Sequence, residues 1–302
     1  MPDMGAITRT TVGRFAPSPS GPLHLGSLVT ALGSYCHARQ RGGLWRLRIE
    51  DLDTPRVVPG AAETILKTLE HLGFEWDGEV VWQSRRFEAY AATLHQLKQD
   101  GWLFDCGCSR REILASAPHA GEEGPVYPGT CRHGLPPGRQ ARSQRLRVDS
   151  GLICFADGLY GQIEQSLQSA VGDFVLRRGD GVYAYQLAVV VDDHAAGITD
   201  VVRGADLLWS TPRQIHLHAC LGHSPPHYIH LPLVLGNDGE KLSKRHQQDV
   251  PVSSDPHLLW QALNFLAQAP PKEMCRASAR EILAWGVENF SLARIRPVDQ
   301  TF

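Results

Sequence analysis

The amino-acid sequence predicts an α/β protein whose core is a Rossmann-like, doubly wound parallel sheet. The first part of the chain alternates strand, helix, strand and helix patterns with short connections, an order that is typical of parallel sheets. Further along, the apolar run within Val182–Val191 suits a strand that is buried on both faces. With 302 residues, the chain is long enough to bury one large apolar core or two smaller ones.

The first strands and helices follow from the spacing of apolar residues and turn residues. Leu25, Leu28, Val29, Leu32 and Cys36 recur at helical spacing directly after a run rich in Pro, Ser and Gly. The elements predicted for this part of the chain are a strand over Thr10–Phe15, a helix from Leu25 to about Arg39, a strand over Leu44–Ile49 and a helix over Ala61–Leu72.

The rest of the chain divides by composition. Residues 106–147 hold many Gly, Pro and Arg and show little periodicity, so we expect an insertion without a large core. It separates two halves of the sheet-forming domain, residues 1–105 and 148–250, and residues 251–302 form a short helical C-terminal segment. The elements predicted after the insertion are strands over Asp173–Arg177 and Val182–Val191, a helix over Pro212–Leu221, a strand over Leu231–Leu235 before the loop Gly236–Arg245, and helices over His257–Ala267 and Ser278–Asn289.

Composition excludes several classes of protein. Hydrophobic residues make up 42% and charged residues 21% of the chain, as in ordinary globular proteins. No apolar run is long enough to span a bilayer and the N-terminus lacks a signal-peptide core, so we expect a cytoplasmic protein with no membrane partner. Seven Cys, an odd number, argue against a disulfide framework. The net charge of −2 leaves any nucleic-acid binding to a local basic patch.

The strongest functional pattern is the run Arg14–Ser27, RFAPSPSGPLHLGS. It describes a tight loop that leads into a helix N-terminus, where unpaired amides and the helix dipole favour phosphate. Gly21 and Gly26 let a ligand approach the backbone, and His24 can donate to phosphate oxygens as charge builds at an α-phosphorus. A Pro/Gly turn that caps an ordinary helix explains any short part of this run, but the full run favours a nucleotide site.

A second pattern, Lys241-Leu-Ser-Lys-Arg245, lies in the loop that Gly236-Asn-Asp-Gly239 opens. The chain has only five Lys, and two of them, Lys241 and Lys244, stand here. Two ammonium groups on a loop flanked by Gly suit the clamping of a triphosphate in a transition state. A short basic loop alone is more often a solvated turn, so this interpretation depends on the first pattern.

A third pattern consists of three cysteines in the insertion, Cys106, Cys108 and Cys131. Three thiolates with one oxygen or nitrogen donor suit a closed tetrahedral zinc site. Unrelated thiols are the alternative. The candidates for the fourth donor are Tyr127, His119 and His133.

The first two patterns resemble the HIGH and KMSKS signatures of class I aminoacyl-tRNA synthetases. Four segments resemble, more specifically, the glutamyl members of this class: Arg14–Pro19, Arg48-Ile-Glu-Asp-Leu-Asp53, Val202-Arg-Gly-Ala-Asp206 and Lys241–Lys244. The match covers about Thr11 to Arg245. Because only a short segment follows the second signature, the layout is similar to that of the truncated glutamyl-Q tRNA(Asp) synthetases, which lack a full anticodon-binding domain.

The resemblance implies a ligase that activates L-glutamate with ATP and transfers glutamate to the queuosine base in the anticodon of tRNA(Asp). It implies ATP with Mg²⁺ as co-substrate, one Zn²⁺ per chain, and a monomer as the expected state. Two alternatives stay open. One is a glutamyl-tRNA synthetase without its anticodon-binding domain, and the other is a non-catalytic paralogue that binds tRNA. Intact His24, Lys241, Ser243 and Lys244 argue against the second.

The resemblance also implies a role for each matching residue. Arg14 and Arg203 would hold the side-chain carboxylate of glutamate, Glu50 its α-ammonium, and Tyr185 would donate a further hydrogen bond. In the zinc site, Tyr127 would be the fourth ligand, with His133 as its rival. Asp192-Asp193-His194 would end a buried strand, as ligand residues often do in open sheets. The implied site residues are His24, Lys241 and Lys244 for catalysis; Arg14, Ala16, Ser18, Glu50, Tyr185 and Arg203 for glutamate; Pro17, His24, Gly26, Ser27, Ser243 and Lys244 for ATP; and Cys106, Cys108, Tyr127 and Cys131 for the metal.

Overall fold

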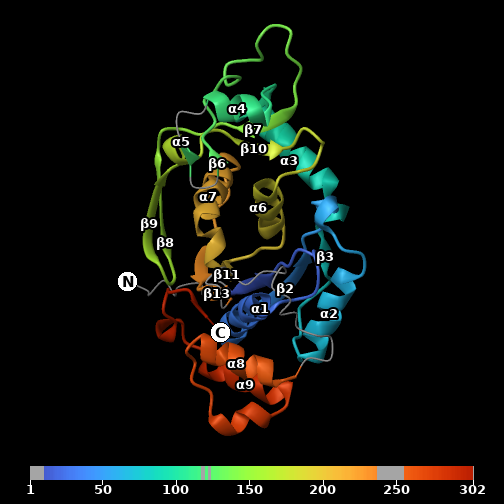
Figure 1. The fold of residues 1–302 in the computed structure, drawn as a ribbon, viewed down its shortest axis with the longest axis vertical. Coiled ribbons are helices and arrows are strands. Elements are labelled where there is room, and N and C mark those ends of the chain that lie inside the picture. The colour runs from blue at the N-terminus through green and yellow to red at the C-terminus, as the bar shows by residue number, and fades with distance from the viewer. Residues whose placement is uncertain (1–9, 117–119, 122–123, 237–254, 302) are drawn as a thin grey trace, which may run out of the picture.

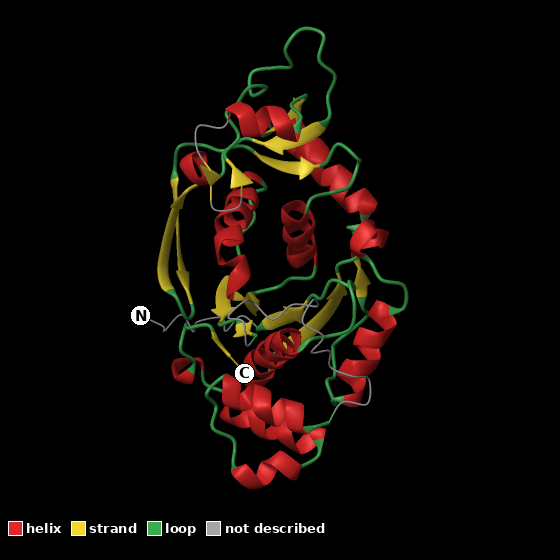
Figure 2. Ribbon diagram, viewed as in Figure 1, coloured by secondary structure: helices red, strands yellow, loops and turns green. Residues whose placement is uncertain are grey.

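The centre of the molecule is a parallel sheet with helices on both sides (Figure 1, Figure 2). The computed structural model describes residues 10–116, 120–121, 124–236 and 255–301. Two parallel ladders, β3-β2-β1 and β11-β12, form the sheet. Thr199, directly before β11, joins them, because its N–H donates to the Val12 carbonyl at 2.9 Å and its hydroxyl accepts from the Val12 N–H at 2.8 Å. The strands are β1 (Val12–Phe15), β2 (Leu44–Ile49), β3 (Val81–Trp82), β11 (Asp200–Gly204) and β12 (His227–Leu231).

The resulting strand order is β3-β2-β1-β11-β12. From β1 the chain adds β2 and β3 on one side, and it later adds β11 and β12 on the other side, so the strand order reverses between β1 and β11. This is the topological switch point at which open α/β sheets bind ligands. It confirms the predicted α/β class with its parallel sheet. The helices that connect or cover these strands are α1 (Leu25–Gln40), α2 (Ala61–His71), α3 (Phe87–Gln99), α6 (Tyr185–Ala195), α7 (Thr211–Cys220), α8 (His257–Phe265) and α9 (Ala279–Asn289).

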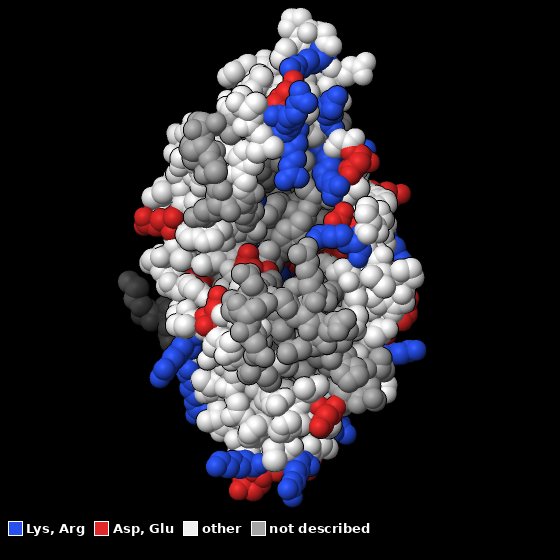
Figure 3. All heavy atoms as spheres, viewed as in Figure 1, with Lys and Arg blue, Asp and Glu red and all other residues white. Residues whose placement is uncertain are grey.

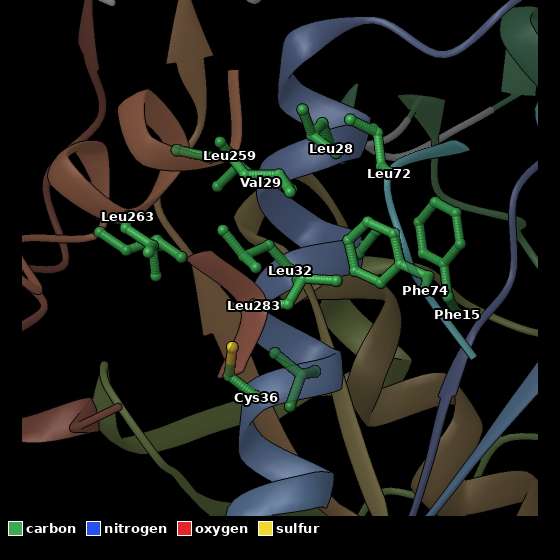
Figure 4. Close-up of a cluster of buried hydrophobic side chains, with 14 of the residues drawn as sticks. Phe15, Leu28, Val29, Leu32, Cys36, Leu72, Phe74, Leu259, Leu263 and Leu283 are labelled. Atoms are coloured by element: carbon green, nitrogen blue, oxygen red, sulfur yellow. The ribbon is translucent and has the colours of Figure 1, made fainter. Parts of the chain in front are cut away.

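The main hydrophobic cluster lies around α1 (Figure 4). Its apolar stripe, with Leu28, Val29 and Leu32 all nearly inaccessible, faces Leu259 and Leu263 of α8 and Leu283 of α9. Gly286 of α9 allows a close contact here, because an added Cβ would stand 3.2 Å from the Cys36 sulfur and 3.3 Å from Leu263. The two predicted C-terminal helices are confirmed, and they complete the core of the parallel-sheet domain.

A second cluster lies on the other side of the sheet, in the upper part of Figure 1. Here α3, α6 and α7 pack beneath an antiparallel sheet with the order β10-β7-β4. Its strands bring together three distant parts of the chain. The elements of this upper part are β4 (Leu103–Cys106), α4 (Arg110–Ser116), β5 (Ala120–Gly121), β6 (Gly124–Pro125), β7 (Ser143–Leu146), the hairpin β8 (Leu152–Asp157) and β9 (Gly161–Ser166), α5 (Leu167–Ala170) and β10 (Phe174–Arg177).

One predicted strand is wrong. The segment Val182–Val191 does not form a strand, and most of it lies in the helix α6. Leu187–Val191 is buried throughout, so no polar face marks the helical period, and a short apolar run does not distinguish a buried strand from a buried helix. Asp192 and Asp193 therefore stand in the last turns of a helix rather than at the end of a strand.

A smaller correction concerns the strand predicted over Leu231–Leu235. Strand β12 begins earlier, at His227, and ends at Leu231, and Val234–Leu235 forms a separate strand, β13, that pairs with β14 (Gln300–Thr301). Pro232 lies between them, and it lacks the N–H that a continuous ladder would need. Within the described ranges, every helix is too short or too polar to be a candidate membrane span.

Candidate active site and metal centre

A cavity of about 650 Å³ opens at the carboxyl ends of the parallel strands, on the switch point between β1 and β11. All ten described residues that the sequence assigned to catalysis, glutamate or ATP line it. The remaining three, Lys241, Ser243 and Lys244, lie outside the described residues. The ten residues are Arg14, Ala16, Pro17, Ser18, His24, Gly26, Ser27, Glu50, Tyr185 and Arg203.

One wall of the cavity is the N-terminus of α1. His24 is the N-cap of this helix, and its Nδ1 accepts a hydrogen bond from the Ser27 N–H at 3.2 Å. Because Nδ1 accepts, the proton of a neutral imidazole is carried by Nε2, the nitrogen that can donate to a ligand. Gly26 packs against the same ring, where an added Cβ would approach its atoms to 3.2 Å. The wall therefore offers helix amides and one imidazole donor, which suits a phosphate.

A buried group of charges lies beside the cavity, and two of its members, Arg14 and Glu50, line it. The Arg48 guanidinium bridges two carboxylates, with Nη1 at 2.6 Å from Asp193 and Nη2 at 3.2 Å from Glu50. Arg14 adds a longer contact of 3.5 Å between its Nε and Asp193. Burial raises the pKa of Asp193, but Arg48 and Arg14 outweigh burial and hold it below its usual range. Asp193 is therefore ionised and fixes the two arginines.

The pKa of Glu50, in the same group of charges, shifts in the opposite direction to that of Asp193. Burial raises the pKa of Glu50, and Arg48 and Arg14 oppose the rise without cancelling it. A cation placed beside Glu50 would favour its ionised form. An incoming ammonium group would supply that charge.

Arg203, at the end of β11, is only 3% exposed and makes hydrogen bonds with neutral groups. Its Nε donates to His230 Nε2 at 3.0 Å, and its Nη2 donates to the Thr211 hydroxyl at 2.8 Å. Its Nη1 lies 3.5 Å from the Tyr185 hydroxyl. A buried guanidinium whose partners carry no charge is costly unless an anion joins it, so this position calls for a carboxylate or phosphate ligand.

Sequence reasoning missed several of these residues. Arg48 stands in the segment Arg48–Asp53, which carries part of the family resemblance, but no role was assigned to it there. Asp193 was singled out without a role, and the structure places it as the partner of Arg48 and Arg14. His230 and Thr211 come from distant segments, and no sequence spacing connects them with Arg203.

The three cysteines of the insertion come together in a buried cluster. Their sulfur atoms lie within 4.8 Å of one another, and Cys108 and Cys131 are 3.7 Å apart. The Tyr127 hydroxyl is 3.4 Å from the Cys106 sulfur and 4.0 Å from the Cys108 sulfur. Zinc–sulfur bonds of about 2.3 Å in a tetrahedron place sulfurs about 3.8 Å apart, so the four donors fit a zinc ion.

The surroundings of the cluster favour the thiolate form at Cys106 and oppose it at Cys108. Burial raises the pKa of Cys106, but hydrogen bonds from Tyr127, the Cys108 backbone and Arg145 outweigh it and bring the pKa to about 7. Burial and the neighbouring Cys131 raise the pKa of Cys108 to about 11. The guanidinium of Arg145 lies 4.0 Å from the centre of the Tyr127 ring. Of the two histidines weighed as fourth donor, His133 is exposed and His119 lies outside the described residues.

Comparison with known proteins identifies the family of the chain. Residues 10–265 match the family described as tRNA synthetases class I (E and Q), catalytic domain. A glutamyl-Q tRNA(Asp) synthetase from Dechloromonas aromatica is 58% identical over 281 residues, which cover 92% of this chain and 93% of the relative. One from Geobacter sulfurreducens is 53% identical over 293 residues, 94% of this chain and 93% of that protein.

Solved structures extend the agreement to the fold. The glutamate-tRNA synthetase from Elizabethkingia anophelis superimposes with a TM-score of 0.80 at 26% identity, over 97% of this chain and 68% of that one. The sequence relatives and the parallel-sheet architecture therefore lead to the same conclusion. This chain belongs to the class I tRNA synthetases (E and Q) and, within them, to the glutamyl-Q tRNA(Asp) synthetases.

Proposed function

We propose that this chain activates L-glutamate with ATP and transfers the glutamyl group to the queuosine base of tRNA(Asp). The observation that carries the glutamate half is Arg203, a buried guanidinium with neutral partners on the floor of a cavity that also contains a helix N-terminus. The acceptor half follows from the relatives, which are more than half identical and share this substrate in their names.

In this proposal the amino acid lies between charges of opposite sign. Arg203, with Arg14 beside it, binds the side-chain carboxylate, and Tyr185 donates to it from the start of α6. Glu50 receives the α-ammonium, whose charge favours the ionised form of that carboxyl. The α-carboxylate is then directed toward the N-terminus of α1. Ala16 and Ser18, on the loop after β1, line the space between them.

Activation joins the glutamate α-carboxylate to the α-phosphorus of ATP and expels pyrophosphate. His24 donates from Nε2 to the α-phosphate, while the amides at the start of α1 and the loop residue Pro17 shape its seat. Gly26 and Ser27 leave room for the nucleotide. Mg²⁺ bound with ATP would neutralise phosphate charge. We assign the clamping of the leaving pyrophosphate to Lys241, Ser243 and Lys244.

In the transfer step, a hydroxyl of the cyclopentene diol of queuosine attacks the glutamyl carbonyl carbon. An ester bond forms, AMP leaves, and the hydroxyl proton is lost to solvent or to the leaving phosphate. RNA recognition favours single-stranded loops with splayed bases, so an anticodon loop suits this cavity. Residues 106–147 contain seven Arg and three Glu, a local excess of positive charge. Figure 3 shows basic side chains gathered at the upper end of this face, where α4, β7 and β10 lie in Figure 1.

The acceptor is tested with two preparations of tRNA(Asp). We expect glutamate transfer to tRNA(Asp) that contains queuosine and none to tRNA(Asp) from cells unable to make it, measured by acid-precipitable labelled glutamate. Removal of the 3′-terminal adenosine should leave transfer intact, because the ester forms in the anticodon. Efficient charging of tRNA(Glu) at its 3′ end would instead identify an ordinary glutamyl-tRNA synthetase.

We also propose that Cys106, Cys108, Tyr127 and Cys131 hold one zinc ion per chain. When bound, zinc would tie together the ends of β4, the segment around Tyr127 and the turn at Cys131. The four donors do not line the active cavity, so the metal serves the shape of the insertion rather than adenylate formation. The geometry of the four donor atoms supports this assignment.

Metal analysis of protein purified without chelator should find about one zinc per chain. Cys108→Ser should lose the ion, because a tetrahedral thiolate site loses one of its soft ligands. The transfer step should suffer more than pyrophosphate exchange. The matched control is Cys154→Ser, which changes an exposed thiol on β8 and should keep the zinc. Zinc-free native protein would refute the assignment.

A further inference from the structure

A chain of buried hydrogen bonds leads from the β8–β9 hairpin to the glutamate pocket. Asp157, the last residue of β8, lies with its Oδ2 2.6 Å from His230 Nδ1, and His230 Nε2 lies 3.0 Å from Arg203 Nε. The three residues are 5%, 0% and 3% exposed. Arg203 lines the cavity, whereas Asp157 and His230 do not. The two therefore stand behind the pocket wall.

The contacts define the proton positions along this chain. Arg203 can only donate, so His230 Nε2 must accept, and the imidazole proton must lie on Nδ1. Nδ1–H then donates to the Asp157 carboxylate. Burial lowers the pKa of His230 although Asp157 opposes the decrease, and the neutral ring that results is the form that can accept from Arg203. Asp157 thus selects the tautomer of His230.

Arg203 is held by a neutral imidazole rather than by a direct ion pair with a carboxylate, and this difference affects ligand binding. A carboxylate in contact with Arg203 would neutralise the guanidinium and compete with a substrate carboxylate. The interposed imidazole orients Arg203 through a neutral contact and keeps the counter-charge of Asp157 one ring away. Arg14 shows the contrast, because its Nε lies 3.5 Å from Asp193.

We propose that Asp157 and His230 form a positioning pair that holds Arg203 for the glutamate carboxylate and thereby sets the preference for glutamate over its uncharged amide. This inference rests on the proposed glutamate site. It makes Asp157, from the β8–β9 hairpin, a determinant of amino-acid affinity. The merely structural alternative is that Asp157 caps its own turn, since its Oδ1 also accepts from the N–H groups of Leu159 and Tyr160 at 3.0 Å each.

Asp157→Asn separates the two roles. The Asn oxygen can still accept from Leu159 and Tyr160, so the turn is kept. The Asn amide then stands in place of Oδ2 and donates to His230 Nδ1, which moves the imidazole proton to Nε2, against the N–H of Arg203. We expect calorimetric titration of the variant with L-glutamate to show affinity reduced by roughly 10- to 100-fold, the size expected for a misdirected buried charged hydrogen bond.

Three further measurements distinguish positioning from general damage. Affinity for ATP should stay within about twofold, and the preference for L-glutamate over L-glutamine should decrease along with glutamate affinity. His230→Gln should bind glutamate better than His230→Ala, because a Gln amide can donate to Asp157 and accept from Arg203. The matched control is Asp200→Asn, which makes the same change in a second Asp–His pair, with His37 at 3.0 Å, away from the cavity and should leave glutamate affinity unchanged.

The outcomes are decisive in each direction. Wild-type glutamate affinity in folded Asp157→Asn, or equal losses for glutamate and ATP, would overturn the positioning role. If Asp157→Asn does not fold, the comparison of His230→Gln with His230→Ala decides, and equal affinities reject the proposal. Failure of the wild-type protein to bind L-glutamate would instead refute the proposed function on which this inference rests.

Discussion

Arg203→Ala is expected to weaken glutamate binding by roughly 100- to 1,000-fold, because a buried carboxylate would lose its charged, hydrogen-bonded partner. Arg203 is 3% exposed, so water cannot readily take over the hydrogen bonds that its guanidinium makes to the carboxylate. Titration of the purified variant with L-glutamate measures the loss. ATP affinity should be retained, and aspartate should not become a good ligand, since the length of the pocket is unchanged.

Two substitutions bracket this result. Arg203→Lys keeps the charge but not the planar fork that contacts His230 and Thr211 together, so its glutamate affinity should fall between those of wild type and Arg203→Ala. Arg178→Ala also removes a positive charge from the cavity wall. Because Arg178 is half exposed and already paired with Asp180, we expect little change in glutamate affinity. Unchanged glutamate affinity in Arg203→Ala would show that Arg203 is structural.

Lys244→Ala should reduce adenylate formation by about two to three orders of magnitude, the effect of losing one preorganised transition-state donor. Glutamate affinity should change little, because Lys244 is assigned to phosphate rather than to the amino acid. Pyrophosphate exchange in the presence of glutamate and ATP measures the loss. Lys244 lies outside the described residues, so this prediction stands on the sequence pattern and the family.

The control for this prediction is Lys67→Ala. Lys67 is exposed on α2 and does not line the cavity, so its removal changes the net charge equally without touching the site. Exchange rates close to wild type are expected for it. If Lys244→Ala also exchanges at the wild-type rate, the loop is not the pyrophosphate clamp.

Local patterns predicted most of the fold. The C-terminal helices α8 and α9 have one apolar face each, and the helix α1, although buried on most sides, has large apolar residues that recur at helical spacing. The helix α6 failed the same test, because Leu187–Val191 is buried on every side and its β-branched residues favoured a strand. Burial from all directions removes the periodic signal on which the prediction depended.

The site shows the same division between local and distant information. His24, Gly26 and Ser27 belong to one continuous run, and the structure places them together on one wall of the cavity. Asp157 and His230 are 73 residues apart, and only the packing of the hairpin against β12 brings them into contact. His230 follows four other histidines, His216, His218, His223 and His227, and their spacing gives no indication of this role.

The packing of α8 and α9 on α1 bears on how this chain could be extended or shortened. Val29 and Leu32 lie against leucines from the two C-terminal helices, so a version cut before α8 would expose this part of the apolar stripe to solvent. The same stripe lies on the helix whose first turn lines the cavity. An engineer who fuses a second RNA-binding module to this enzyme should therefore attach it after β14 and leave both helices in place.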